Sequence, residues 1–114
     1  MRVHHIALRT RDLPRAERFW VELFGLAVLR RDGERAVWLD LDGAILMLER
    51  AAQGEPAPPP EGMDFFALAT DAPGRAAFVA RCAAGGVAIE HETAFTTYVR
   101  DPDGRRVGVS TWGR

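Results

Sequence analysis

The residues able to do chemistry in this sequence are few: three histidines, one tyrosine, one cysteine and sixteen carboxylates. His5 stands in an apolar run near the N-terminus, and Glu49 and Tyr98 stand in two later runs. An imidazole titrates near neutral pH, so His5 could act as a general base or as a ligand-binding donor, with Glu49 or Tyr98 assisting proton transfer. All fifteen basic residues are arginines, which excludes Schiff-base catalysis by lysine. The sole serine, Ser110, lies in no Gly-x-Ser-x-Gly motif, so no hydrolase nucleophile is indicated.

The composition narrows the class of protein and its partners. The chain has 114 residues, enough for a single domain with a real core, and a formal net charge of −1, so nothing points to a nucleic acid or a membrane surface. No apolar run has the form of a signal peptide or the length of a bilayer span, which favours a cytoplasmic protein. The single cysteine, Cys82, excludes an internal disulfide and a multi-cysteine zinc site, and we expect it in the core.

An internal repeat predicts how these residues are positioned. Residues 5–10 and 65–70 share the pattern Ala-Leu-x-Thr, and each copy is followed by an aspartate able to cap a helix and by a proline, Pro14 or Pro73. We therefore expect two modules, 1–52 and 63–114, joined by a proline-rich linker over 53–62. The expected helices cover 13–24 and 73–84, and the expected strands cover 2–10, 26–31, 35–41, 44–50, 63–70, 87–91, 95–100 and 106–112.

Two turns predict which side chains share a face of each sheet. The Asp42-Gly43 turn pairs Trp38 with Met47 on one face of the sheet. It also pairs Leu39 with Leu46 on the other face, which is apolar and is expected to pack under the helix. A three-residue loop with Gly104 in the left-handed conformation pairs Tyr98 with Gly108. Trp38, Met47, Phe65 and Tyr98 then point away from the helices, and such an apolar surface with a few polar groups is typical of a small-molecule site.

Four stretches carry a resemblance to a known family: His5-Ile6-Ala7-Leu8, Asp12-Leu13 leading into Phe19-Trp20, Leu23-Phe24-Gly25-Leu26, and Arg100-Asp101-Pro102-Asp103-Gly104. Over residues 1–112 the chain resembles the vicinal oxygen chelate superfamily, which holds glyoxalase I, extradiol dioxygenases, fosfomycin-resistance enzymes and bleomycin-resistance proteins. The resemblance implies an α+β fold of two tandem βαβββ modules, each a half-barrel mixed sheet, around a cleft. It also implies a homodimer, whose cleft lies within one chain or between two.

The resemblance also locates the positions that hold a divalent ion in the metal-using members. These positions correspond here to His5, Met47, Phe65 and Gly108, and only His5 supplies a ligand atom suited to such an ion. We therefore expect no metal and no other cofactor. The alternative is a displaced divalent metal site formed by His5 and Glu49.

Three classes of function follow from these residues. The first is a metal-free binding protein of the bleomycin-resistance type, which sequesters a small molecule in an aromatic-lined cleft made by His5, Trp38, Met47, Phe65, Tyr98 and Gly108. The second is a metal-free enzyme that uses His5, with Glu49 or Tyr98, for proton transfer. The third is a lyase, isomerase or dioxygenase-like enzyme with His5 as a residual metal ligand. We take the first as the leading hypothesis.

Overall fold

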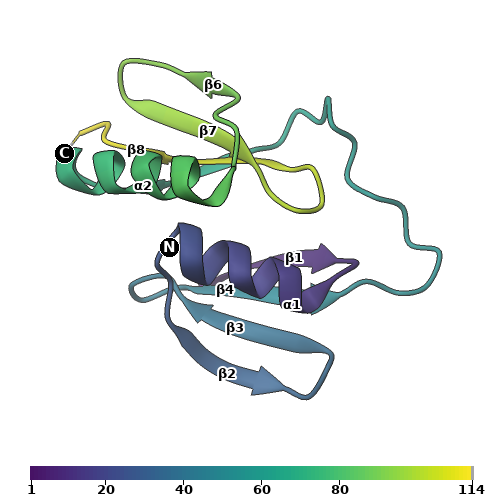
Figure 1. Ribbon diagram of the computed structural model, residues 1–114. Coiled ribbons are helices and arrows are strands. Elements are labelled where there is room, and N and C mark those ends of the chain that lie inside the picture. The colour runs from purple at the N-terminus through teal and green to yellow at the C-terminus, as the bar shows by residue number, and fades with distance from the viewer. Residues whose placement is uncertain (114) are drawn as a thin grey trace. The chain divides into compact units, whose positions relative to one another are not determined.

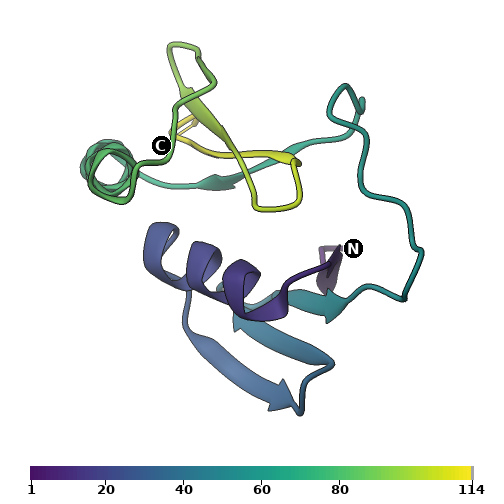
Figure 2. The same ribbon diagram turned by 45° about the vertical axis from the view of Figure 1, so that its right-hand side comes forward.

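The computed structural model describes residues 1–113. The chain divides into two compact units, Met1–Pro56 and Ala57–Arg114, and the division falls inside the segment predicted as the linker. Each unit contains one four-stranded sheet and one helical segment lying across that sheet, as Figures 1 and 2 show from two directions.

Unit 1 is a mixed sheet in the order β1-β4-β3-β2, in which β1 runs parallel to β4 and the other neighbours are antiparallel. A helix links the first two strands, and its last part widens into a π-helical turn, η1. The elements are β1 (His5–Thr10), α1 (Leu13–Arg18), η1 (Phe19–Leu23), β2 (Val28–Asp32), β3 (Ala36–Asp40) and β4 (Ile45–Arg50).

Unit 2 repeats this arrangement with the sheet order β5-β8-β7-β6, again with one parallel pair, β5 and β8. Its elements are β5 (Phe66–Ala69), α2 (Ala72–Gly85), β6 (His91–Glu92), β7 (Thr96–Arg100) and β8 (Arg106–Ser110). The predicted α+β fold of two tandem βαβββ modules is confirmed.

The helices begin where the sequence predicts because an aspartate caps each of them. The Asp12 carboxylate accepts a hydrogen bond from the Arg15 amide at 3.1 Å, and the Asp71 carboxylate accepts one from the Gly74 amide at 2.8 Å. These contacts satisfy amide groups that have no partner inside the helix.

The core of each unit lies between its helix and one face of its sheet. In unit 1, Leu39, Leu46 and Leu48 are fully buried there, and Trp20 contributes the largest buried side chain. In unit 2 the buried side chains include Val99 and Val107 of the sheet and Phe78 and Cys82 of α2. The core position predicted for Cys82 is confirmed.

The two predicted hairpin registers are also confirmed. Asp42 and Gly43 both have positive φ, at 55° and 96°, as a two-residue turn of this type requires, and Trp38 pairs with Met47. Gly104 has φ +92°, and Tyr98 pairs with Gly108. A local turn fixes the pairing of both strands beyond it, and hence the face on which every side chain lies.

Several strand boundaries differ from the prediction, among them the start of β1 at His5 and the end of β8 at Ser110, and two of the differences bear on the site. The strand expected over 87–91 is only His91–Glu92, because the Val87 amide donates to the Cys82 carbonyl and so closes the end of α2 instead of entering the sheet. Strand β5 starts at Phe66, so Phe65 lies just ahead of it. Within residues 1–113, no helix is both long and apolar enough to cross a bilayer.

Candidate functional site

The face of the unit 1 sheet that α1 does not cover, the open face of unit 1, carries two predicted residues side by side, Trp38 and Met47. Trp38 of β3 pairs with Met47 of β4, and Met47 in turn lies beside Ala7 of β1. Trp38 and Met47 are half-buried, and the Arg30 guanidinium lies 5.2 Å from the centre of the Trp38 ring. This row of the open face therefore combines an aromatic ring, a thioether and a cation.

His5 is exposed at the start of β1, and its nearest polar partner is its neighbour. The Nδ1 atoms of His4 and His5 lie 2.8 Å apart, so one imidazole donates a hydrogen bond to the other. This arrangement leaves the Nε2 atom of His5 without a hydrogen-bond partner among residues 1–113. Sequence reasoning missed the pairing, although two consecutive histidines before a strand were the visible signal.

Glu49 and His5 do not converge. In the parallel β1–β4 pair His5 lies beside Ile45, whereas Glu49 lies beside Arg9, four residues further along. At the rise of a β-strand this separates the two positions by about 13 Å, too far for both side chains to bind one ion. Glu49 instead lies 3.8 Å from the Arg9 guanidinium. Among residues 1–113 no three His, Cys, Asp or Glu side chains gather in a way that could hold a metal.

A groove of about 660 Å³ lies at the edge of unit 1 beside Glu49. Its lining mixes alanines with charged residues and includes Arg9, Arg35 and Asp32, together with residues 50–53. Arg35 lies 3.2 Å from Asp32, so charges of opposite sign face each other across short distances. Neither Trp38 nor Met47 lines this groove, which therefore differs in character from the apolar site expected from the sequence.

The open face of unit 2, on the side of the sheet away from α2, brings three predicted residues together. The rings of Phe65 and Tyr98 meet edge to face with their centres 5.4 Å apart, and Tyr98 lies opposite Gly108. The Arg106 guanidinium lies 5.7 Å from the centre of the Phe65 ring and 5.4 Å from that of Tyr98. His91 stacks on Tyr98 at 6.3 Å.

Gly108 is required by its neighbours. A Cβ atom at this position would lie 2.2 Å from the Thr97 carbonyl oxygen and 3.0 Å from Cδ1 of Tyr98. Only glycine lets the backbone and the tyrosine ring come this close. The side-chain space at position 108 is thus taken by Tyr98, and Gly108 acts through the position of that ring.

An ion-pair network borders these rings. The Glu90 carboxylate accepts hydrogen bonds from Arg100 and from the Nε atom of Arg106, the latter at 2.8 Å. Hydrogen bonding from Arg100, supported by Arg106, lowers the pKa of Glu90 below its ordinary value despite partial desolvation. The opposition of Arg100 and Arg106 follows from the Gly104 loop, but the part played by Glu90 depends on a strand whose place was predicted wrongly.

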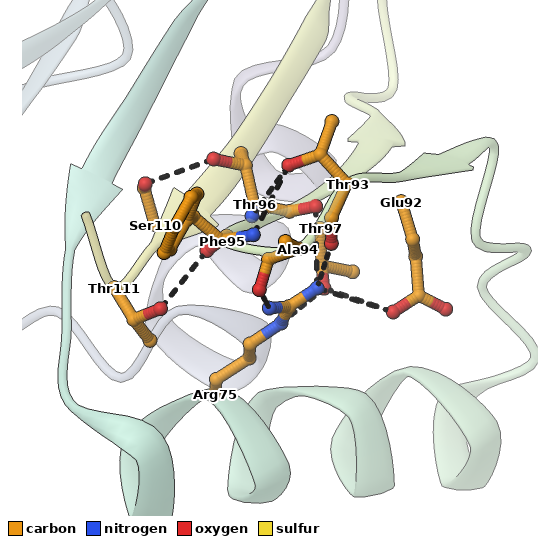
Figure 3. A network of polar contacts seen from close by, with 9 residues as sticks. All are labelled: Arg75, Glu92, Thr93, Ala94, Phe95, Thr96, Thr97, Ser110 and Thr111. Atoms are coloured by element: carbon orange, nitrogen blue, oxygen red, sulfur yellow. Dashed lines mark hydrogen bonds and ion pairs between the residues drawn. The ribbon is translucent and has the colours of Figure 1, made fainter.

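One arginine of α2 holds the hairpin that carries Tyr98 (Figure 3). Arg75 donates from Nε to the Thr97 hydroxyl at 2.9 Å, and from Nη1 to the Ala94 carbonyl at 2.9 Å. Its Nη2 atom donates to the Thr93 carbonyl at 3.0 Å and lies 3.3 Å from Glu92. A single guanidinium thus fixes the 92–97 segment against the helix.

Comparisons with known proteins place this arrangement in a family. A family model described as Glyoxalase/Bleomycin resistance protein/Dioxygenase superfamily matches residues 2–109. A lactoylglutathione lyase from Agrobacterium tumefaciens is similar in structure with a TM-score of 0.78 and 22% identity, over 99% of this chain and 97% of that one. A possible glyoxalase from Bacillus cereus is similar with a TM-score of 0.79 and 24% identity, over 96% of this chain and 98% of that one. A fosfomycin resistance protein from Listeria monocytogenes is similar with a TM-score of 0.80 and 16% identity, over 96% of this chain and 89% of that one. A sequence search of curated proteins finds no match.

Proposed function

The chain belongs to the superfamily of glyoxalases, bleomycin resistance proteins and dioxygenases, and from that premise we propose that it binds a small planar molecule on the open faces of its sheets without a metal ion. The observation that carries the proposal is the aromatic and apolar character of those faces. Trp38 and Met47 occupy one, and Phe65 and Tyr98 occupy the other. Flat organic molecules gain both apolar burial and ring contacts from such surfaces.

The separation of His5 from Glu49 supports the metal-free form of the proposal. A hard divalent ion needs several oxygen or nitrogen ligands, and Met47, Phe65 and Gly108 supply none. His5 would therefore serve a ligand as a hydrogen-bonding group through its Nε2 atom.

Tryptophan fluorescence provides the test. Trp38 is the tryptophan on an open face, whereas Trp20 is buried under the sheet and Trp112 is exposed near the end of the chain. A planar compound that binds should shift the emission of the chain, and Trp38→Phe should remove most of that shift while Trp112→Phe preserves it. A ligand-dependent signal that survives in Trp38→Phe would contradict binding at this face.

A second candidate function is catalysis by His5 within the same family. The hydrogen bond between the Nδ1 atoms of His4 and His5 holds the imidazole in place, and with His5 as its donor the Nε2 atom carries the lone pair that a general base requires. Turnover in a screen of lyase, isomerase and dioxygenase substrates that disappears in His5→Gln would favour this function. Binding without turnover, unchanged in rate by His5→Gln, would favour sequestration.

A further inference from the structure

The open face of unit 2 carries charged side chains beside its aromatic rings. Glu90 is shared between two guanidinium groups, those of Arg100 and Arg106. These three side chains together carry two positive charges and one negative charge. We call them, with the rings of Phe65 and Tyr98, the Arg106 cluster.

Arg100 is committed to the structure of the unit. Its Nη1 atom donates to the Pro60 carbonyl at 2.8 Å and to the Gly104 carbonyl at 3.0 Å, and its Nε atom donates to Glu90. The nearby carboxylates of Glu61 and Asp101 also act on its charge. This guanidinium has little capacity left for a ligand.

Arg106 is different. Its Nε and Nη2 atoms both lie 2.8 Å from the same oxygen of Glu90, and its Nη1 atom has no partner among residues 1–113. The hydroxyl of Tyr98 likewise makes no hydrogen bond to any other described residue. Both side chains are partly exposed, so the Arg106 Nη1 group and the Tyr98 hydroxyl can each donate a hydrogen bond to a ligand beside the two aromatic rings.

Unit 1 offers a contrast. On its open face Arg9 of β1 lies between two carboxylates, at 2.8 Å from Glu55 and 3.8 Å from Glu49. Two negative charges there face one positive charge, so that part of the open face of unit 1 would not attract an anion.

We propose that Arg106 and the Tyr98 hydroxyl bind the carboxylate of a planar aromatic acid whose ring packs against Phe65. A carboxylate accepts parallel hydrogen bonds from a guanidinium, and its single negative charge complements that of Arg106. A dianion such as a phosphate monoester would be opposed by Glu90, which lies against the same guanidinium. The inference rests on the proposed function and specifies its ligand class.

The test compares two probes with the same ring system, the anionic 2-naphthoate and the neutral 2-naphthamide. Each is titrated into the full ¹⁵N-labelled chain, and dissociation constants come from the amide shifts of residues 65–67, 98 and 106–108. Wild-type protein should bind the acid about tenfold or more tightly than the amide, since a charged hydrogen-bonding pair is worth that much at a partly exposed site. Tyr98→Phe should weaken binding of the acid and leave the amide nearly unchanged.

Arg106→Gln should abolish the preference for the acid, and Arg106→Lys should retain part of it. The matched control is Arg81→Gln, which removes an equal charge from the exposed surface of α2 and should retain the full preference. A preference that persists in Arg106→Gln would overturn the assignment to Arg106.

Equal binding of both probes to the wild-type chain, or binding of neither, would overturn the inference. The proposed function is judged separately. It stands if neutral planar compounds shift the same resonances, and it fails if planar compounds of every charge leave both open faces unshifted.

Discussion

At position 108 a single hydrogen atom in place of a methyl group decides whether Tyr98 can lie where it does. We expect Gly108→Ala to lower the free energy of unfolding by about 1–3 kcal/mol, since the new Cβ would overlap the Thr97 carbonyl and crowd the tyrosine ring. Urea denaturation measures the change. Gly85→Ala is the control, because nothing lies within 4 Å of its Cβ position in α2 and alanine favours a helix. Equal stability of the Gly108→Ala and wild-type chains would contradict the close approach.

Glu90 makes the stability of unit 2 depend on pH. Its pKa in the folded chain lies below the ordinary value of 4.5, chiefly because Arg100 donates to the carboxylate, so the ionised form favours folding. The contribution is fully present above about pH 4.5 and is lost as the pH falls through the lowered pKa. Glu90→Gln should therefore destabilise the chain at pH 7 but approach the wild-type stability in acid. Parallel denaturation curves at pH 7 and pH 3 test this, and a difference that grows toward low pH would contradict it.

Among elements, the 92–97 segment depends on one guanidinium of α2. Arg75→Gln would lose contacts with two carbonyls and the Thr97 hydroxyl, so we expect faster amide exchange over this segment and a loss of about 2 kcal/mol in stability. Hydrogen-exchange mass spectrometry locates the effect. Arg81→Gln on the same helix should leave the segment protected. Uniformly faster exchange across unit 2 would mean that Arg75 supports the whole core instead of the hairpin.

The hairpin registers could be predicted from the sequence because short turns determine them. Asp42-Gly43 and Gly104 determine two hairpin registers, which place Trp38 beside Met47 and Tyr98 beside Gly108. The short β6 was predicted wrongly because the end of α2 uses the Val87 amide, a competition between helix cap and sheet that strand propensity does not express. The contact of Glu90 with Arg106 depends on where the chain runs after α2, so it could not be predicted from the sequence.

The connection between the two units is anchored at both of its ends. On the side of unit 1, Arg9 pairs with Glu55 at 2.8 Å and Arg11 donates to the Glu55 carbonyl at 3.0 Å. On the side of unit 2, Arg100 donates to the Pro60 carbonyl at 2.8 Å. The composition of 53–62 predicts a linker but not these anchors, since each is made by an arginine far away in the sequence.

For the whole molecule we expect a homodimer. Two small modules in a 114-residue chain bury a limited core, and pairing adds to the apolar area removed from water. Light scattering at micromolar concentration should give twice the 12.6 kDa mass of the chain. A mass of one chain that persists as the concentration rises tenfold would contradict this expectation.

Binding without a metal is tested most directly by an NMR titration of the chain after dialysis against EDTA. Neutral and acidic planar compounds are added, and the amide shifts of the two open faces are followed before and after one equivalent of Zn²⁺, Ni²⁺ or Mn²⁺. We predict shifts around Trp38, Met47, Tyr98 and Gly108 in the metal-free chain, with dissociation constants that the ions leave unchanged. Binding that appears only after an ion is added, with the resonances of His5 shifted by that ion, would contradict the proposed function.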